Sequence, residues 1–377
     1  MKLAGIRVVE IGQVLAAPFA GMIFADLGAE VIKVEKPGGG DDARTMGPEF
    51  RDGASMTFHD VNRGKRSVQV DLKSAEGRAQ LERLLADADV LIHNLRPGEA
   101  ARMGVDAATL MPRFPRLVYC EITAFGHTGP RRLQPGYEPL LQAYSGLVSM
   151  NGSPEGPPAR MGASLVDFGT GMWSVIGILA ALRERDATGR GTLVNTSLLE
   201  SALTWGSPRI HALVNQGQPS LRHGTAHPGL VPYQAFDHPD GALMICCGND
   251  RLFAKLAGVL GQPQWASDAR YATNRQRLQH RAELVADIHA ALATAPRAHW
   301  QAVLEAAGVP VSPVHEFPEV VGDAQVRALD MIREVGGEGF VLAGLPLSFD
   351  GVRPPVDRPA PRLGEANAQY LGPGAPS

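Results

Sequence analysis

The chain has 377 residues, of which 44% are hydrophobic and 20% charged, a composition typical of a soluble globular protein with more than one domain. The formal net charge of -3 excludes a strongly basic, nucleic-acid-binding character. Three cysteines, two of them adjacent, fit neither a disulfide framework nor a metal knuckle, and the N-terminus has no secretion signal. We therefore expect a cytoplasmic protein with no metal site, no membrane partner and no nucleic-acid partner.

The first forty residues predict a βαβ unit. Residues 6–11 (IRVVEI) form a short β-branched run typical of a buried strand. Residues 18–27 predict a helix with proline in its first turn and Gly28 at its C-terminal end. Residues 30–34 (EVIKV) predict a second strand, so the two strands are expected to be parallel.

The alternation continues to about residue 125. Strands are predicted at 67–71, 89–93 and 116–122, with a helix at 74–87. This pattern is typical of an open, doubly wound α/β sheet. The residues after the first strand, GQVLAA, lack the GxGxxG fingerprint, which argues against a nicotinamide enzyme.

Further along, helices are predicted at 170–185 and 196–205, followed by a polar linker at 206–224. A smaller unit then begins with a hairpin, strands 233–236 and 242–246 joined around Asp240-Gly241, and continues with helices at 253–260 and 281–293. The proline-rich tail after residue 350 is expected to extend over a partner chain or over the first domain.

Asp167 is the leading candidate for chemistry. It ends an apolar stretch and directly precedes a helix predicted to begin near Gly169, where the helix dipole would keep a carboxylate ionised. An ionised carboxylate can attack a thioester, and Gly169 and Gly171 would leave room for an acyl group. The alternative is a helix N-cap, a role that aspartate fills well.

Other candidates follow strands or begin helices. Arg96 and Arg102, after the strand at 89–93, could meet phosphates at the carboxyl edge of the sheet, or could be a solvated turn. The glycine-rich loop after Lys36 could close over a nucleotide, or could be a flexible connection. Tyr137 and Glu138 could face a pocket, or could simply start a helix.

Several stretches together resemble the CaiB/BaiF family, which contains class III CoA-transferases and α-methylacyl-CoA racemases. The resemblance covers residues 5 to about 250 in family order, and its most specific stretches are GIRVVEIGQVLAAPFAGMIFADLGAEVIKVEKPGGGD, ADVLIHNLRPGEAARMG, PGYEPLLQAYSG, LVDFGTGMWSVIGILAALRER and HGTAHPGLVPYQAF.

The resemblance implies a fold and a site. It implies a large Rossmann-like domain with an open parallel sheet, built from 1–205 plus 325–377, and a small α/β domain at 225–320, with two chains interlocked in a homodimer. It implies Asp167 as the catalytic nucleophile and coenzyme A as a substrate, with no tightly bound cofactor. The CoA contacts carried over by motif are Leu15, Ala16, Lys36, Val70, Asp71, Leu72, Lys73, Asn94, Leu95, Arg96, Arg102, Tyr137 and Glu138.

Two departures from the family pattern sharpen the expected reaction. Racemases of the family carry a histidine where this chain has Tyr137, and tyrosine is a poor proton shuttle at pH 7, so a CoA-transferase is favoured over a racemase or an idle CoA-binding protein. Leu15 replaces a glutamine of the formyl-CoA transferases, which argues against oxalate chemistry. The stretch at 223–236 resembles members that act on succinyl-CoA and small dicarboxylic acids, so Arg222 and its histidine neighbours could hold a distal carboxylate, or could shape the linker.

Overall fold

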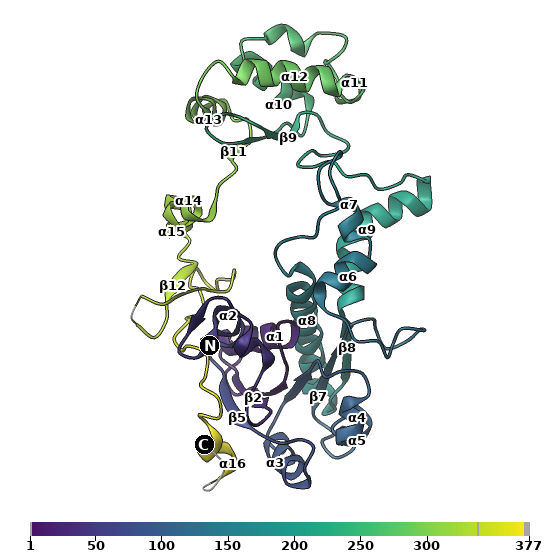
Figure 1. Ribbon diagram of the computed structural model, residues 1–377, viewed down its shortest axis with the longest axis vertical. Coiled ribbons are helices and arrows are strands. Elements are labelled where there is room, and N and C mark those ends of the chain that lie inside the picture. Colours follow the sequence, from purple (N-terminus) through teal and green to yellow (C-terminus); the bar gives the residue numbers. More distant parts are fainter. Residues whose placement is uncertain (1, 338, 373–377) are drawn as a thin grey trace. The chain divides into compact units, whose positions relative to one another are not determined.

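The computed structural model describes residues 2–337 and 339–372. The chain divides into two units (Figure 1). The large unit comprises Met1–Val148, Arg160–Pro219 and Leu329–Ser377, and the small unit comprises Ser149–Ala159 and Ser220–Ala328. The excursion at Ser149–Ala159, which belongs to the small unit, left no signal in the sequence pattern.

A six-stranded parallel sheet forms the centre of the large unit. Its spatial order is β5 (Arg66–Gln69), β2 (Glu30–Glu35), β1 (Arg7–Ile11), β6 (Val90–His93), β7 (Val118–Thr123) and β8 (Leu193–Ser197). The chain therefore fills one half of the sheet outward from β1 and then the other half outward from β6. This is the doubly wound order, and ligands of such sheets bind where the order reverses, here between β1 and β6.

Alternating side chains of the strands supply two hydrophobic cores, one on each face. Val8 belongs to the core under α1 (Ala16–Asp26) and α8 (Leu165–Thr188), and its neighbour Val9 belongs to the core of the opposite face. That second core is covered by α3 (Ala75–Leu85), α4 (Glu99–Met103) and α5 (Ala107–Leu110) (Figure 1). The predicted α/β class with helices on both faces is confirmed.

Helices α1 and α8 approach each other closely because residue 171 is glycine. A Cβ atom on Gly171 would lie 2.8 Å from the carbonyl oxygen of Ala16 and 2.8 Å from the ring of Phe19. The ring of Phe19 in turn packs edge-on against Phe168, with centroids 4.7 Å apart. The N-terminal parts of the two helices are therefore in direct contact.

Three boundaries differ from the sequence-based prediction. Helix α8 begins at Leu165 rather than near Gly169, so Asp167 lies inside its first turn and is not the N-cap. Residues 196 and 197, predicted as helical, belong to strand β8. The next helix starts only at Leu198, because the Ser197 side chain caps it by accepting a hydrogen bond from the Glu200 N–H. Helix α9 (Leu198–Gln216) then continues through Pro208, so residues 206–216 are helical and not a linker.

By length and composition alone, α8 could cross a membrane. Half of its most apolar window is buried within the chain. Its buried residues face the sheet and its neighbours α1 and α9, as expected for the core helix of a layered domain.

The C-terminal tail completes the edge of the sheet at β5. The backbone N–H of Ala366 donates to the Ser67 carbonyl (3.0 Å), and the Asn367 side chain accepts from the Gln69 N–H (2.8 Å). Other elements of this unit are α2 (Met56–Asn62), α6 (Glu138–Tyr144), α7 (Leu147–Met150, which runs into the small unit), α16 (Asn367–Leu371), a 3-10 turn at Asp42–Thr45, and the two-stranded pairs β3 (Phe50–Arg51) with β4 (Ala54–Ser55) and β12 (Ile332–Glu334) with β13 (Val341–Ala343).

The small unit has its own core around a three-stranded antiparallel sheet. The predicted hairpin is present as β9 (Tyr233–Phe236) and β10 (Leu243–Cys246), and β11 (Val311–Pro313) pairs on the other side of β10. Its helices are α10 (Asp250–Val259), α11 (Asn274–Gln279), α12 (Arg281–Leu292), α13 (Arg297–Ala306), α14 (Phe317–Gly322) and α15 (Ala324–Ala328), with a 3-10 turn at Pro263–Ala266.

Substituting Gly171 by alanine should destabilise the large unit by about 1–3 kcal/mol, because the added methyl group meets backbone atoms of α1. Urea-induced unfolding would measure this. Gly258 is the matched control, since it lies within α10 with open space at its Cβ position, and its replacement by alanine should stabilise by about 0.5–1 kcal/mol. Equal effects at the two positions would contradict the close contact of α1 with α8.

Candidate active site

A cavity of about 530 Å³ opens at the carboxyl ends of the strands, at the point where the strand order reverses. Its lining comes from the segments that follow β1, β2, β5 and β6 and from α4. The lining residues are Ile11, Gly12, Gln13, Val34, Glu35, Lys36, Pro37, Gly40, Asp41, Val70, Asp71, Leu72, Lys73, Leu95, Glu99 and Met103. The site is therefore built where parallel strands of this order collect ligands.

The structure brings together many of the residues that the sequence singled out. Six of the expected CoA contacts line the cavity, namely Lys36, Val70, Asp71, Leu72, Lys73 and Leu95. Arg96 directly follows Leu95, and Arg102 lies on α4 between two lining residues; both are exposed. The ammonium group of Lys73 and the two guanidinium groups therefore lie on or next to the cavity, where they could pair with phosphates.

Asn94 has a structural task at this place. Its side-chain amide accepts from the Gln13 N–H (2.9 Å) and donates to the Gln13 carbonyl (2.8 Å), which ties the end of β6 to the segment after β1. Asn94 thus joins the ends of β1 and β6, the two strands between which the strand order reverses. Its expected contact with CoA stays a prediction.

The residue before it, His93, is held as a neutral imidazole of one tautomer. The Tyr119 hydroxyl donates to the Val105 carbonyl (2.7 Å), so the His93 Nε2–H must donate to the Tyr119 oxygen (2.9 Å). His93 Nδ1 then accepts from the Leu95 N–H at 3.3 Å. Burial lowers the pKa of His93 to about 4, which keeps this arrangement uncharged. His93 therefore orients the loop that carries Leu95.

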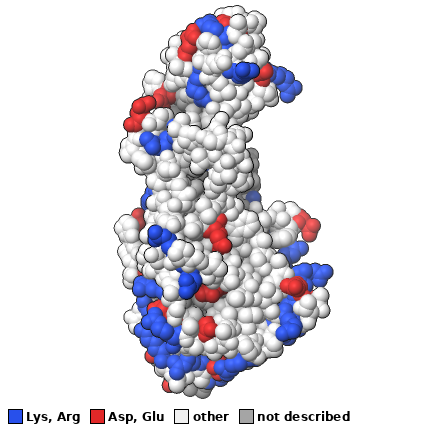
Figure 2. Space-filling model, turned by 90° about the vertical axis from the view of Figure 1, so that its right-hand side faces the viewer, with Lys and Arg blue, Asp and Glu red and all other residues white. Residues whose placement is uncertain are grey.

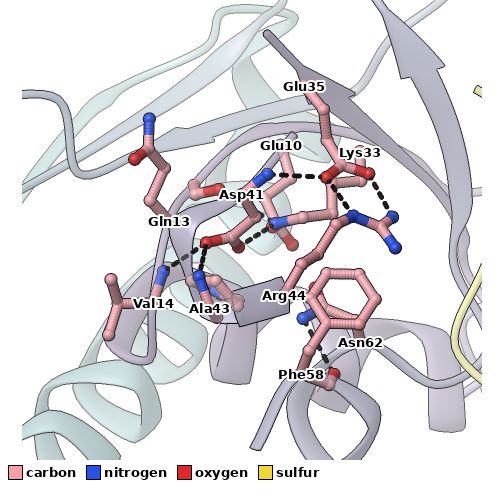
Figure 3. Close-up of polar contacts among 12 residues, drawn as sticks. Glu10, Gln13, Val14, Lys33, Glu35, Asp41, Ala43, Arg44, Phe58 and Asn62 are labelled. Carbon is pink, nitrogen blue, oxygen red and sulfur yellow. Dashed lines mark hydrogen bonds and ion pairs between the residues drawn. The ribbon is translucent and has the colours of Figure 1, made fainter. Parts of the chain in front are cut away.

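A buried network of charges lies behind the cavity wall (Figure 3). The Lys33 ammonium, with no exposed side-chain surface, contacts Glu10 (2.9 Å), Asp41 (2.9 Å) and the Gly12 carbonyl (2.9 Å). Lys65 contacts the second oxygen of Glu10 at 2.6 Å. The sequence analysis missed this network, although lysine in the buried run EVIKV was its signal, since a buried cation requires a partner.

Burial alone would lower the pKa of both lysines. For Lys33 the charges of Asp41, Glu10 and Glu35 outweigh burial and hold its pKa above the usual range. For Lys65 burial dominates and lowers the pKa to about 7, although Glu10 opposes the shift. The network therefore keeps Lys33 charged.

Asp41 connects this network to the segment after β1. Its Oδ1 accepts from the Val14 N–H (3.0 Å) and from the Ala43 N–H (2.9 Å). Val14 has φ +64°, a left-handed conformation that a β-branched residue adopts at a cost of about 1–3 kcal/mol. We call residues 12–15 the β1–α1 turn, and it is held in a strained shape from both sides, by Asp41 and by Asn94.

Asp167 lies one helical turn before Gly171, the residue of α8 that packs against Ala16 at the end of this turn. It is the third residue of α8, and the spacing of one turn places it on the same side of the helix as Gly171. Burial, and next the charge of Glu138, raise the pKa of Asp167 to about 7. We expected the helix dipole to keep this carboxylate ionised, but burial and the charge of Glu138 shift its pKa in the opposite direction.

Glu138 is fixed beside Asp167 by neighbouring groups. As the first residue of α6 it is 4% exposed, and its Oε1 accepts from the Gln142 side chain (2.6 Å) and from the Val166 N–H (3.3 Å). Within the part of the chain that the structure describes, its Oε2 is buried and has no hydrogen-bond partner. Tyr137, which precedes it, is 66% exposed. A buried acceptor oxygen thus adjoins the candidate nucleophile.

In the small unit, Arg222 is engaged with its own unit. Its guanidinium donates to the carbonyls of Ser153 (3.2 Å) and Gly156 (3.0 Å), which holds the excursion Ser149–Ala159. These bonds favour a structural role over the capture of a carboxylate. Among residues 2–337 and 339–372, no group of three His, Cys, Asp or Glu side chains is placed to hold a metal ion.

Known proteins resemble this chain over almost its whole length. The family described as CoA-transferase family III matches residues 3–367. A succinate–glutarate CoA-transferase of Agrobacterium fabrum is 38% identical, covering 98% of this chain and 94% of that protein. An acetyl-CoA:oxalate CoA-transferase of Acetobacter aceti is also 38% identical, covering 97% and 93%.

Among solved structures, a CaiB/BaiF family protein from Brucella suis superimposes with a TM-score of 0.88. It is 37% identical, and the match covers 98% of both chains. The two-unit α/β architecture is therefore shared with a protein of the family that the sequence motifs indicated.

The raised pKa of Asp167 predicts a pH-dependent stability. The folded state binds this proton more tightly than the unfolded state, so stability is lost as the pH rises from near 4 to about 7. Asp167→Asn, which cannot ionise, should therefore be more stable than the wild type at pH 8, by on the order of 1–3 kcal/mol, with the difference shrinking towards pH 4. Urea unfolding at both pH values measures it. The control Asp186→Asn, at an exposed position of the same helix, should show no such change with pH, and a pH-independent effect of Asp167→Asn would contradict the shift.

Proposed function

The chain belongs to CoA-transferase family III, and we propose that it moves CoA from an acyl-CoA donor to a carboxylic acid through covalent intermediates on Asp167. The observation that carries this proposal is the position of Asp167. It lies in the first turn of α8, one helical turn before Gly171, which packs against the start of α1, and the turn before α1 lines the cavity. A thioester reaching out of the cavity along this turn would arrive at the carboxylate.

The proposed reaction has four attacks. The Asp167 carboxylate attacks the thioester carbonyl of the donor, which forms a mixed anhydride and releases the CoA thiolate. The thiolate attacks the Asp167 carbonyl, giving an aspartyl-CoA thioester and the free donor acid. The acceptor carboxylate then attacks this thioester, forming a second anhydride and the thiolate again. The thiolate finally attacks the acceptor's acyl carbon, which gives the new acyl-CoA and restores Asp167.

Glu138 supports the first of these attacks. Its negative charge and the burial of Asp167 raise the pKa of the nucleophile to about 7, so the carboxylate is more basic than an exposed aspartate. A more basic carboxylate is a stronger nucleophile once it is ionised. Poor access of water near a buried carboxylate also protects the anhydride and the thioester from hydrolysis.

The cavity suits the phosphorylated part of CoA. Lys36 and Lys73 line it, and Arg96 and Arg102 lie on the segment after β6 that also contributes to its wall. Lys36 pairs with Asp42 and Arg102 with Glu99, and we expect phosphate groups of CoA to compete with these carboxylates. CoA is then a substrate that enters and leaves, not a resident cofactor.

The relatives suggest which acids to test. One is named for succinate and glutarate, as the motif at 223–236 predicted, and another for acetyl-CoA and oxalate. We propose succinyl-CoA as donor and a small dicarboxylic acid as acceptor. Because an oxalate-named relative is equally identical to this chain, Leu15 alone is no argument against oxalate.

We also propose that the enzyme is an interlocked homodimer. Large apolar side chains remain exposed on α8 and α9 of the isolated chain, and charged side chains are sparse over the middle of the face in Figure 2. Exposed apolar surface of this extent is typical of a protein interface. The side chains concerned are Met172, Trp173, Ile176, Leu179, Leu203, Trp205, Ile210, Leu213 and Val214.

Hydroxylamine trapping tests the covalent mechanism. Wild-type protein incubated with succinyl-CoA and quenched with hydroxylamine should carry a hydroxamate on the peptide that contains Asp167, detected by mass spectrometry. Asp167→Asn should remain unmodified and lose CoA transfer to glutarate and oxalate, by a factor on the order of 10⁴ or more. The control Asp186→Asn should be labelled like the wild type.

An unlabelled Asp167 with several acyl-CoA donors would overturn the proposal. Exchange of the α-proton of an acyl-CoA in heavy water, without transfer to any acid, would indicate the racemase alternative instead.

The dimer is tested by sedimentation. The molecular mass of the wild type from sedimentation should be twice that of one chain. Ile176→Glu should weaken the association of the two chains at least tenfold, because a charge would be buried in an apolar interface. Gln279→Glu, at an exposed position of the small unit, is the control and should sediment as the wild type. A wild-type protein that is monomeric at micromolar concentration would contradict the dimer.

A further inference from the structure

The β1–α1 turn links the two parts of the candidate site. Gly12 and Gln13 line the cavity, and the turn runs directly into Ala16, which contacts Gly171 one helical turn from Asp167. Any displacement of this turn therefore changes the position of the cavity wall relative to the start of α1, against which the nucleophile's helix packs.

The shape of the turn depends on Asp41. Valine at φ +64° does not hold this conformation by its own preference, so other bonds must impose it. The bond from the Val14 N–H to Asp41 Oδ1 (3.0 Å) acts on the strained residue itself, whereas Asn94 holds the residue before it. Figure 3 shows the Asp41 carboxylate pointing towards the Val14 and Ala43 N–H groups and towards Lys33.

Asp41 is itself fixed in three directions. Its Oδ2 lies 2.9 Å from the Lys33 ammonium, its own N–H donates to Glu35 Oε2 (2.8 Å), and its Oδ1 also caps the turn Asp42–Thr45 through Ala43. Glu35 is held in turn by two bonds from Arg44, of 2.8 and 2.7 Å. Asp41 is 1% exposed, and its carboxylate cannot move without breaking these bonds.

We propose that Asp41, backed by Lys33, is a positioning residue for CoA transfer. It holds Val14 in its left-handed conformation and thereby sets the distance between the CoA cavity and Asp167. This inference rests on the proposed function. Asp41 also lines the cavity, but its carboxylate is bonded to Val14 and Lys33, and its effect on transfer acts through the turn.

The test combines two substitutions. Asp41→Ala should lower kcat/KM for CoA transfer by about 10- to 100-fold, because reacting groups that are misplaced by an ångström lose this much. Glycine adopts φ +64° without strain, so Val14→Gly needs no anchor. In the Val14→Gly background, the factor by which Asp41→Ala lowers kcat/KM should therefore be at least fivefold smaller than in the wild type. Asp41→Asn, which keeps an acceptor for the Val14 N–H, should retain more activity than Asp41→Ala.

A purely structural role would give a different pattern. Asp26→Ala is the matched control, since Asp26 is a buried carboxylate that pairs with Arg63 (2.7 Å) near the other end of α1. Both variants should lower the midpoint of urea unfolding, but only Asp41→Ala should lower kcat/KM of the folded fraction. Only Asp41→Ala should also speed amide hydrogen exchange in the peptide that covers residues 12–17.

Two results would overturn the inference. One is an equal activity loss from Asp41→Ala with valine or glycine at position 14. The other is unchanged hydrogen exchange at 12–17. Failure of the proposed function is distinguishable, because it would appear in the wild type, as absence of transfer and of labelling at Asp167. Exchange at 12–17 in Asp41→Ala would still show whether Asp41 holds the turn.

Discussion

One ammonium group organises the carboxyl edge of the sheet. The Lys33 Nζ lies inside the protein with no exposed surface and is surrounded by Glu10, Asp41 and the Gly12 carbonyl. With Lys65 and the Glu35–Arg44 pair, the network brings together three basic side chains and three carboxyl groups. Loss of one partner from such a pair typically costs 3–5 kcal/mol, because the other charge remains buried. The loops after β1 and β2 are consequently joined to each other by buried ion pairs and hydrogen bonds.

The candidate nucleophile, in contrast to the buried network, lies beside a group of the same charge. Asp167 is half-buried beside a second carboxylate, Glu138, and its pKa is raised to about 7. The same fold thus pairs the buried charges of the network with opposite charges, but places the Asp167 carboxylate beside another carboxylate. Stability is therefore lower at the site than it could be, as is common for reactive groups.

The strand–helix alternation was predictable from sequence because periodicity and β-branched runs are local signals. The six expected residues at the cavity were implied by the family resemblance, and of them Lys36 and Leu95 also follow predicted strands. Strand β8 was missed because Ser197 and Thr196 read equally well as a helix start. The direction of the Asp167 pKa shift could not be predicted, because it depends on burial by α6 and α1, which are distant in sequence. The same holds for the amide of Asn94, whose partner Gln13 is 81 residues away.

The tail that lies along β5 has a consequence for synthesis. The large unit is assembled from three separate stretches of chain, and the last one pairs with the edge strand through Ala366 and Asn367. When the first two hundred residues have been synthesised, all six strands of the sheet have been made but the segment that pairs with β5 has not. The β5 edge therefore stays open to pairing with other chains until residues 366 and 367 can reach it.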